Sequence, residues 1–420
     1  MDKMLQTIRK KFSRYIIFLS LIGPGLITAL GDNDAGGIAS NSAAGAHFGY
    51  SFLWILFVIT IALTIILDMC VRMGIVTGKG LMDLIRENFG LKWSIFAISC
   101  LFIANFATIV SNLGGVAGGI EILGGSRYIL LPIIVLFAWL LLLFGTYKIV
   151  EKSLLIISLV ILSYIGSAFL AKPDWGLVLK QTFIPSIEFS SSYFMLIIAF
   201  VGTTIAPWML FFIQSMTVDK GLTIKHLRFS RLEVWLSSFL TDYAISFFII
   251  IACAATLFRA GIKIDDVADA ALALRPLAGN FCFFLFSIGL LAASILATFL
   301  LPLTTAYAVC ETFGFENGLN RKPQEAPIFY QIITFLLFTG MAIVLIPGIK
   351  IFPLIIFAQV VAGIITPILL IFILSLINDK ELLGKYKNGP IFNAISWATV
   401  LSVIFITFLY LILIFTHKVI

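Results

Sequence analysis

Two aspartates inside a strongly apolar stretch are the residues of this chain most in need of a chemical explanation. Asp32 and Asp34 lie in the segment GPGLITALGDNDAGGIASNSAAGA, residues 23–46. A charge at the centre of a membrane helix costs at least about 2.5–3.5 kcal/mol, so charged residues at such positions usually have a function. Pro24 and the surrounding glycines weaken the helix at the same place. Carboxylates beside unwound backbone are typical of the cation sites at broken membrane helices.

Asp34 is the first candidate ligand for such a cation. Unwinding frees backbone carbonyls near Gly31, and carbonyls with a carboxylate form a hard-oxygen site. Asp32 lies two positions earlier and points away if the segment is extended, so we place it in the lining of the site. Either aspartate has an alternative role, which is to cap the second half of the helix by accepting hydrogen bonds from its free amides.

A second weak point in an apolar stretch is the motif GTTIAPW. Pro207 removes a backbone donor, which leaves carbonyls free near Gly202 and Thr203. These carbonyls are candidate ligands, although Thr203 and Thr204 equally suit a role in bonding their own helix. Trp208 lies too deep for the interfacial aromatic belt, so it either packs in the core or forms a cavity wall.

Three further polar residues lie deep in apolar segments. Gln359, in PLIIFAQVVAGIITP, either hydrogen-bonds across helices or acts as an outer ligand. Asp242 has no partner close in sequence and is a candidate for an ion pathway. Asp68 lies one helical turn before Arg72, a spacing that predicts a local ion pair.

Composition identifies the elements that must hold these residues. The chain has 420 residues, of which 61% are hydrophobic and 12% charged, so it is an all-α polytopic membrane protein rather than a soluble one. Windows of about 19 residues predict eleven transmembrane helices. They lie near residues 16–46, 51–75, 93–117, 127–146, 150–172, 191–216, 232–258, 279–308, 327–347, 351–377 and 391–416.

The net charge of +7 predicts an orientation and no nucleic-acid partner. Most Lys and Arg residues fall in the segments that share a side with the amino terminus. The positive-inside rule therefore predicts a cytoplasmic amino terminus and an extracellular carboxyl terminus in the plasma membrane. The expected surroundings are the lipid bilayer alone, with no obligate protein partner.

The two weak points predict an internal repeat. The first and sixth spans are both interrupted, so each heads a group of five, and corresponding breaks in two halves indicate an inverted repeat around a central site. We therefore expect one membrane domain, 1–420, with repeats at 16–172 and 191–377. The span at 391–416 would be an accessory helix outside the repeat.

These motifs together resemble those of the Nramp family of divalent-metal transporters. GPGLITALGDNDAGG is similar to the family's GPG…DPGN segment, with Asp34 at the metal-binding aspartate. MCVRMGIVTGKGLMDLI resembles its ARLGxVTGKxL stretch, and GTTIAPW its GATVMPH segment. FAQVVAGIITP resembles its SQVLxSxxLP segment, with Gln359 at the binding-site glutamine. The resemblance implies a LeuT-type 5+5 inverted-repeat fold and alternating access.

Departures from the family pattern concern the residues around the ion. Gly37 stands where the family has the ligand asparagine, and Ala206 where it has a methionine whose sulfur favours Mn²⁺ and Fe²⁺. Trp208 replaces a histidine, and Asn105 and Thr108 replace acids of the proton route. These differences resemble the branch of Nramp-related magnesium transporters, which implies Mg²⁺, and also Mn²⁺, as cargo without proton coupling.

Ligand chemistry agrees with that branch. Mg²⁺ gives up water reluctantly, and smaller side chains at the two positions leave space for a hydrated ion. We therefore expect an importer that carries Mg²⁺, and Mn²⁺ as a second ion, as transported substrates, with no resident cofactor. The alternatives are a proton-coupled Mn²⁺/Fe²⁺ importer and an organic-solute carrier on the same fold. The sequence contains no nucleophile–base pair and no zinc-ligand spacing, so we do not expect an enzyme.

Overall fold

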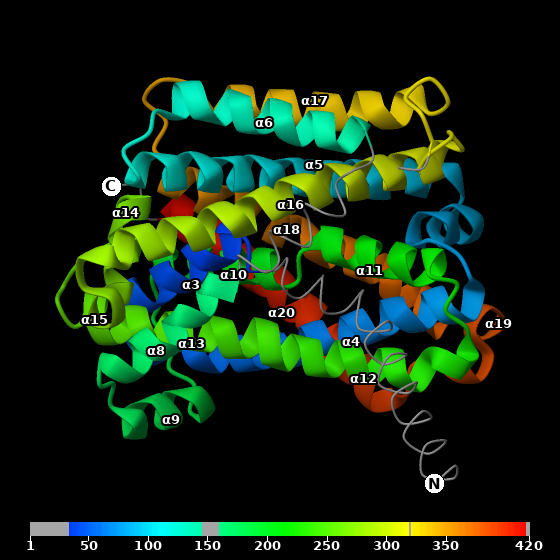
Figure 1. The fold of residues 1–420 in the computed structure, drawn as a ribbon. Helices are drawn as coiled ribbons and strands as arrows, with labels where there is room; N and C mark the ends of the chain where they lie inside the picture. The colour runs from blue at the N-terminus through cyan, green and yellow to red at the C-terminus, as the bar shows by residue number, and fades with distance from the viewer. Residues whose placement is uncertain (1–32, 145–158, 319–320, 417–420) are drawn as a thin grey trace, which may run out of the picture.

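The computed structural model describes residues 33–144, 159–318 and 321–416, and within these ranges the regular structure is entirely helical (Figure 1). The α-helices, in chain order, are α3 (Ala35–Phe48), α4 (Leu53–Thr77), α5 (Leu81–Ile122), α6 (Arg127–Leu143), α8 (Ser163–Leu170), α9 (Trp175–Phe183), α10 (Ser191–Thr204), α11 (Pro207–Asp219), α12 (Leu227–Ser237), α13 (Ala244–Cys253), α14 (Val267–Ala271), α15 (Arg275–Ala278), α16 (Cys282–Phe313), α17 (Pro327–Val344), α18 (Ile351–Asn378), α19 (Lys380–Leu383) and α20 (Pro390–Thr416).

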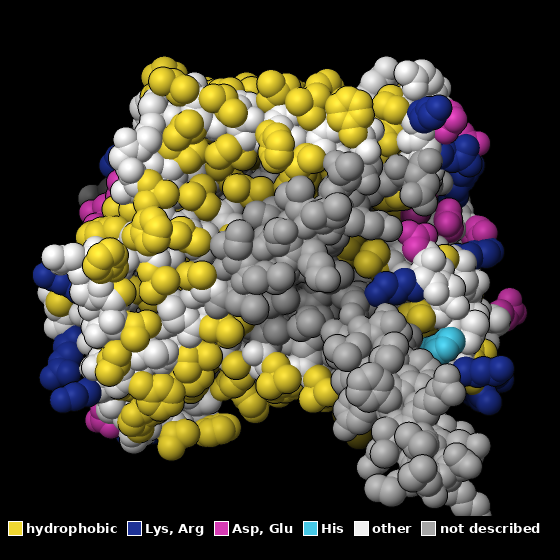
Figure 2. Space-filling model, viewed as in Figure 1, with side chains coloured by type: hydrophobic (Ala, Val, Ile, Leu, Met, Phe, Trp, Pro, Cys, Tyr) yellow, Lys and Arg dark blue, Asp and Glu magenta, His cyan; other side chains and the backbone are white. Residues whose placement is uncertain are grey.

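Eight helical stretches in the described part of the chain are long and apolar enough to cross a membrane, and α6 is a shorter apolar helix. Eleven were expected. Most of the expected first span precedes residue 33, and the expected fifth span, 150–172, is described only from residue 159. The surface agrees with a bilayer environment, because apolar side chains cover wide areas of the described part of the visible face while charged ones gather at its left and right margins (Figure 2).

The long helix α5 is the centre of the packing. It lies against both α16 and α18, and α18 also packs against α10. The pair formed by α6 and α17 covers α5 on one side of the molecule (Figure 1). The helix α3 packs between α13, α10 and α18, and all of its residues from Ala35 to Ala46 are buried. A carboxylate at the start of α3 is therefore placed inside the bundle.

The predicted ion pair between Asp68 and Arg72 is confirmed. The carboxylate of Asp68 lies 2.9 Å from Nε of Arg72, and both side chains are buried. The same carboxylate also pairs with Arg231 of α12, and Arg72 donates to the carbonyl of Tyr386 at 2.9 Å. This network joins α4, α12 and the segment before α20 at one end of the bundle, away from the start of α3.

Candidate functional site

Asp34 is the N-cap of α3. Its backbone is extended, with φ −76° and ψ −170°, and its Oδ1 accepts a hydrogen bond of 3.0 Å from the backbone N–H of Gly37. The side chain is only 3% exposed. The alternative role as a cap is thus confirmed, and Gly37, expected among the metal-site residues, supplies a donor to the carboxylate. The cap uses one lone pair of Oδ1, and a carboxylate has about four lone-pair sites. The cap is therefore compatible with a second role of Asp34 as a cation ligand.

Asn112 of α5 holds the other oxygen of this carboxylate. Its Nδ2 donates to Oδ2 of Asp34 at 2.7 Å, and its Oδ1 accepts from the backbone N–H of Ala35 at 3.2 Å. Asn112 is fully buried. It was not among the residues singled out from the sequence, where it is one polar residue in the run IVSNLGG. Its importance comes from its position opposite the first turn of α3, and this position follows only from the tertiary fold.

Gln359 of α18 reaches the same turn of α3. Its Nε2 donates to the hydroxyl of Ser111 at 3.1 Å, so the expected hydrogen bond across helices is confirmed. Its Oε1 is buried and is without a hydrogen-bond partner within the described residues. A Cβ on Gly36 would lie 2.0 Å from Nε2 of Gln359, so the amide fits only because residue 36 is glycine. An amide oxygen in this state is available as a hard ligand.

The helix that carries GTTIAPW stops and restarts within the motif. α10 ends at Thr204 and α11 begins at Pro207, while Ala206 has extended backbone with φ −64° and ψ 130°. Pro207 lacks an N–H, so the carbonyl of Thr203 cannot receive the usual helical hydrogen bond. Thr203 and Thr204 are both buried. The end of α10 thus provides backbone acceptors inside the bundle.

Gly202 has a packing role that the sequence did not reveal. A Cβ at this position would lie 2.0 Å from the carbonyl oxygen of Gln359 and 2.4 Å from the backbone nitrogen of Gly363. The backbones of α10 and α18 are therefore in contact at Gln359 itself. This contact fixes the position of Gln359 along α18 relative to the end of α10. The role of the Gly202 carbonyl as a ligand stays a prediction.

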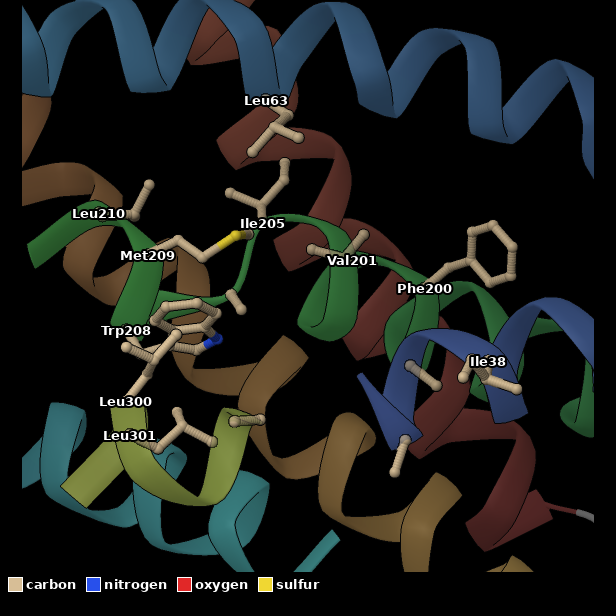
Figure 3. Close-up of a cluster of buried hydrophobic side chains, with 14 of the residues drawn as sticks. Ile38, Leu63, Phe200, Val201, Ile205, Trp208, Met209, Leu210, Leu300 and Leu301 are labelled. Atoms are coloured by element: carbon tan, nitrogen blue, oxygen red, sulfur yellow. The ribbon is translucent and has the colours of Figure 1, made fainter. Parts of the chain in front are cut away.

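Trp208 belongs to an apolar cluster beside the break. Its side chain is 1% exposed and its ring centroid lies 5.9 Å from that of Phe212. Figure 3 shows Trp208 close to Met209 and to Leu300 and Leu301 of α16. The packing role is therefore observed, and the role as a cavity wall stays a prediction.

Three expected residues cannot be placed. Gly31 and Asp32 precede the described residues, and the side chain of Asp242 is also outside what the structure describes. The backbone of Asp242 belongs to a π-helical turn, Ser238–Tyr243, a feature often found at functional positions. Their roles as ligand, lining and ion pathway stay predictions.

The chemistry available at the start of α3 is that of a mainly neutral oxygen site. In the described part of the chain, no three His, Cys, Asp or Glu side chains are grouped to hold a metal. A cation here would meet one carboxylate, one amide oxygen, backbone carbonyls and water. Such a set suits hard divalent ions that keep part of their hydration.

A polar cavity of about 450 Å³ lies elsewhere, beside the α4–α5 connection and the ends of α11 and α16. Its walls include the side chains of Asp83, Asp219 and Glu311, with Arg86 as a cation among them. An excess of carboxylates in a concave surface raises the local concentration of cations. The cavity thus favours cations at one end of the bundle.

Two glycines beside Gln359 give a stability prediction. Gly202→Ala should lower the free energy of unfolding by about 2 kcal/mol or more, because its methyl group meets backbone that cannot yield. Gly36→Ala should cost less than Gly202→Ala, because its methyl group meets the side chain of Gln359, which can shift, and no backbone atom. Unfolding of the purified variants in detergent checks this, and equal losses would contradict the close backbone contact of α10 and α18.

Comparisons with known proteins agree with the geometry. Residues 25–415 match the family Nramp, Natural resistance-associated macrophage protein-like. The chain is 26% identical over 396 residues to the divalent metal cation transporter MntH of Caldanaerobacter subterraneus, which covers 89% of this chain and 88% of that protein. It is also 26% identical over 389 residues to MntH of Bacillus subtilis, covering 90% and 88%.

Solved structures share the fold. A manganese transporter of Eremococcus coleocola superposes with a TM-score of 0.74 at 20% identity, covering 95% of this chain and 87% of that one. Mhp1, a nucleobase-cation-symport-1 family transporter, superposes with a TM-score of 0.57 at 15% identity, covering 93% and 91%. The family match spans nearly the whole sequence, so this chain belongs to the Nramp family, whose members are membrane transporters and not enzymes.

Proposed function

We propose that this protein imports a divalent metal cation, with Mg²⁺ as its cargo and Mn²⁺ as a second ion, by alternating access and without proton coupling. The observation that carries the proposal is the buried carboxylate of Asp34 at the start of α3, with Gln359 against Gly36 of the same turn and its amide oxygen without a hydrogen-bond partner among the described residues. The names of the MntH relatives support divalent metal transport in general. The choice of Mg²⁺ rests on the residues of this chain.

The ligands favour a hard and partly hydrated ion. Asp34 would supply the charge, while Gln359 and the carbonyls near Gly31, Gly202 and Thr203 would hold water or bind directly. Gly37 and Ala206 add no ligand side chain, which leaves room for the water that Mg²⁺ retains. Ala206 also adds no sulfur, so the preference of soft ligands for softer metals is absent at this position.

The membrane potential is a sufficient driving force in this scheme. Moving one charge through 100 mV is worth about 2.3 kcal/mol, so a divalent ion gains about 4.6 kcal/mol without any coupled proton. The interruption between α10 and α11, together with an interruption expected before α3, would form the two hinges of a 5+5 repeat. The amino terminus would then be cytoplasmic and the carboxyl terminus extracellular, in the plasma membrane.

A second candidate is proton-coupled import of Mn²⁺. It is favoured by the name of the similar structure, a manganese transporter. The two candidates differ in whether millimolar Mg²⁺ competes with Mn²⁺. They differ also in whether uptake depends on a pH gradient across the membrane.

Loss of the carboxylate should abolish transport while leaving a folded protein. In liposomes, Asp34→Ala should reduce Mn²⁺ and Mg²⁺ uptake at least a hundredfold, because Asp34 supplies the buried carboxylate at the start of α3. Asp174→Ala is the matched control, since Asp174 also caps a helix, α9, but is exposed. Residual uptake by Asp34→Ala near the wild-type rate would place the site elsewhere.

Ion preference should depend on residue 206. Ala206→Met introduces a sulfur at the break between α10 and α11, so uptake of Cd²⁺ relative to Mg²⁺ should rise about tenfold or more. Ala206→Leu has similar bulk without sulfur and should not raise this ratio. The ratio is measured by competition of each ion with Mn²⁺ uptake. An unchanged ratio in the Met variant would contradict a position of Ala206 beside the ion.

A further inference from the structure

The side chain of Asn112 uses both of its donor hydrogens and its acceptor oxygen in hydrogen bonds to the start of α3 and to its own helix, α5. Its Nδ2 donates to Oδ2 of Asp34 at 2.7 Å and to the carbonyl of Thr108 at 3.0 Å. Its Oδ1 accepts from the backbone N–H of Ala35 at 3.2 Å. An asparagine amide has two donor hydrogens and one acceptor oxygen. Both donors and the acceptor of Asn112 are therefore occupied.

These partners allow only one orientation of the amide. If the amide were rotated by 180°, its oxygen would face the carboxylate of Asp34 and the carbonyl of Thr108, which both only accept. Its NH₂ group would then face the N–H of Ala35, which only donates. The orientation of Asn112 is consequently fixed by its neighbours, and a fixed donor holds the carboxylate of Asp34 in one direction.

The preceding residue acts in the same way on the other candidate ligand. Ser111 accepts from Nε2 of Gln359 at 3.1 Å, and the Oε1 of Gln359 is left without a partner among the described residues. Ser111 and Asn112 are both fully buried. Two adjacent residues of α5 thus hold one polar side chain from α3 and one from α18.

We propose that Ser111 and Asn112 are positioning residues of the cation site, which orient Asp34 and Gln359 before the ion arrives. This inference rests on the proposed function. The two residues do not touch the ion themselves in this scheme. They hold the two ligands still before binding, so less conformational entropy is lost when the ion binds. They therefore act on affinity rather than on the rate of the transport cycle.

The test compares leucine substitutions at two asparagines of α5. Asn112→Leu keeps the shape of the side chain but removes the amide, so the KM for Mn²⁺ uptake in liposomes should rise about tenfold with little change in Vmax. This is the size expected for one hydrogen bond to a charged group. Asn105→Leu is the matched control, because Asn105 is equally buried two turns away and bonds to Thr305. Its KM should stay within twofold of wild type.

Ser111→Ala extends the test to the second ligand. Its KM should rise about threefold, and the double variant Ser111→Ala/Asn112→Leu should show about the product of the two increases, because each residue holds a different ligand. A second measurement is the Kd for Mn²⁺ in detergent by calorimetry. It should follow the same order and confirm that the change concerns binding.

The outcomes separate this inference from the proposed function. If wild type transports Mn²⁺ and Asp34→Ala does not, but Asn112→Leu keeps the wild-type KM and Kd, the positioning role is wrong while the function stands. A purely structural role of Asn112 would lower the yield of folded protein or the Vmax of Asn112→Leu and leave its KM unchanged. If wild type neither binds nor transports Mn²⁺ or Mg²⁺, the function and the positioning role both fall.

Discussion

A carboxylate held by neutral hydrogen-bond donors inside the helix bundle is the constraint on which this structure depends. An isolated charge is costly in a low-dielectric interior, so Asp34 must be surrounded by groups that stabilise it. The backbone N–H of Gly37 and the amide of Asn112 do this without adding a positive charge. A cationic partner would compete with an arriving metal ion, whereas neutral donors leave the negative charge available. Under the proposed function, the start of α3 would therefore hold its carboxylate stably and still attract a cation.

Close packing brings the other polar groups to the same place. Gly36 allows the amide of Gln359 to lie across the first turn of α3, and Gly202 allows α10 to touch α18. Both contacts would be lost with any larger residue. The interruption between α10 and α11 then exposes carbonyls at the end of a helix that is already in contact with α18. Apolar packing around Trp208 closes this region on the side of α16.

The sequence predicted those features that have a local cause. Apolar length predicts membrane-crossing helices, Pro207 predicts the start of α11, and the spacing of Asp68 and Arg72 predicts their ion pair. The cap role of Asp34 was one of two alternatives for the same local reason. Ser111 and Asn112 could not be found in this way, because their partners are 78 and 248 positions away in the chain. Asn105 and Thr108 of α5 stand where the family has acids, and the same helix holds both candidate ligands through Ser111 and Asn112.

The most direct test of the account is uptake of Mg²⁺ into liposomes that contain the purified protein, a trapped Mg²⁺ indicator and a trapped pH indicator. With a membrane potential negative inside, the account predicts that Mg²⁺ accumulates and that the interior pH stays constant. Absence of Mg²⁺ uptake in liposomes that do take up Mn²⁺, or acidification in proportion to the metal that enters, would contradict it.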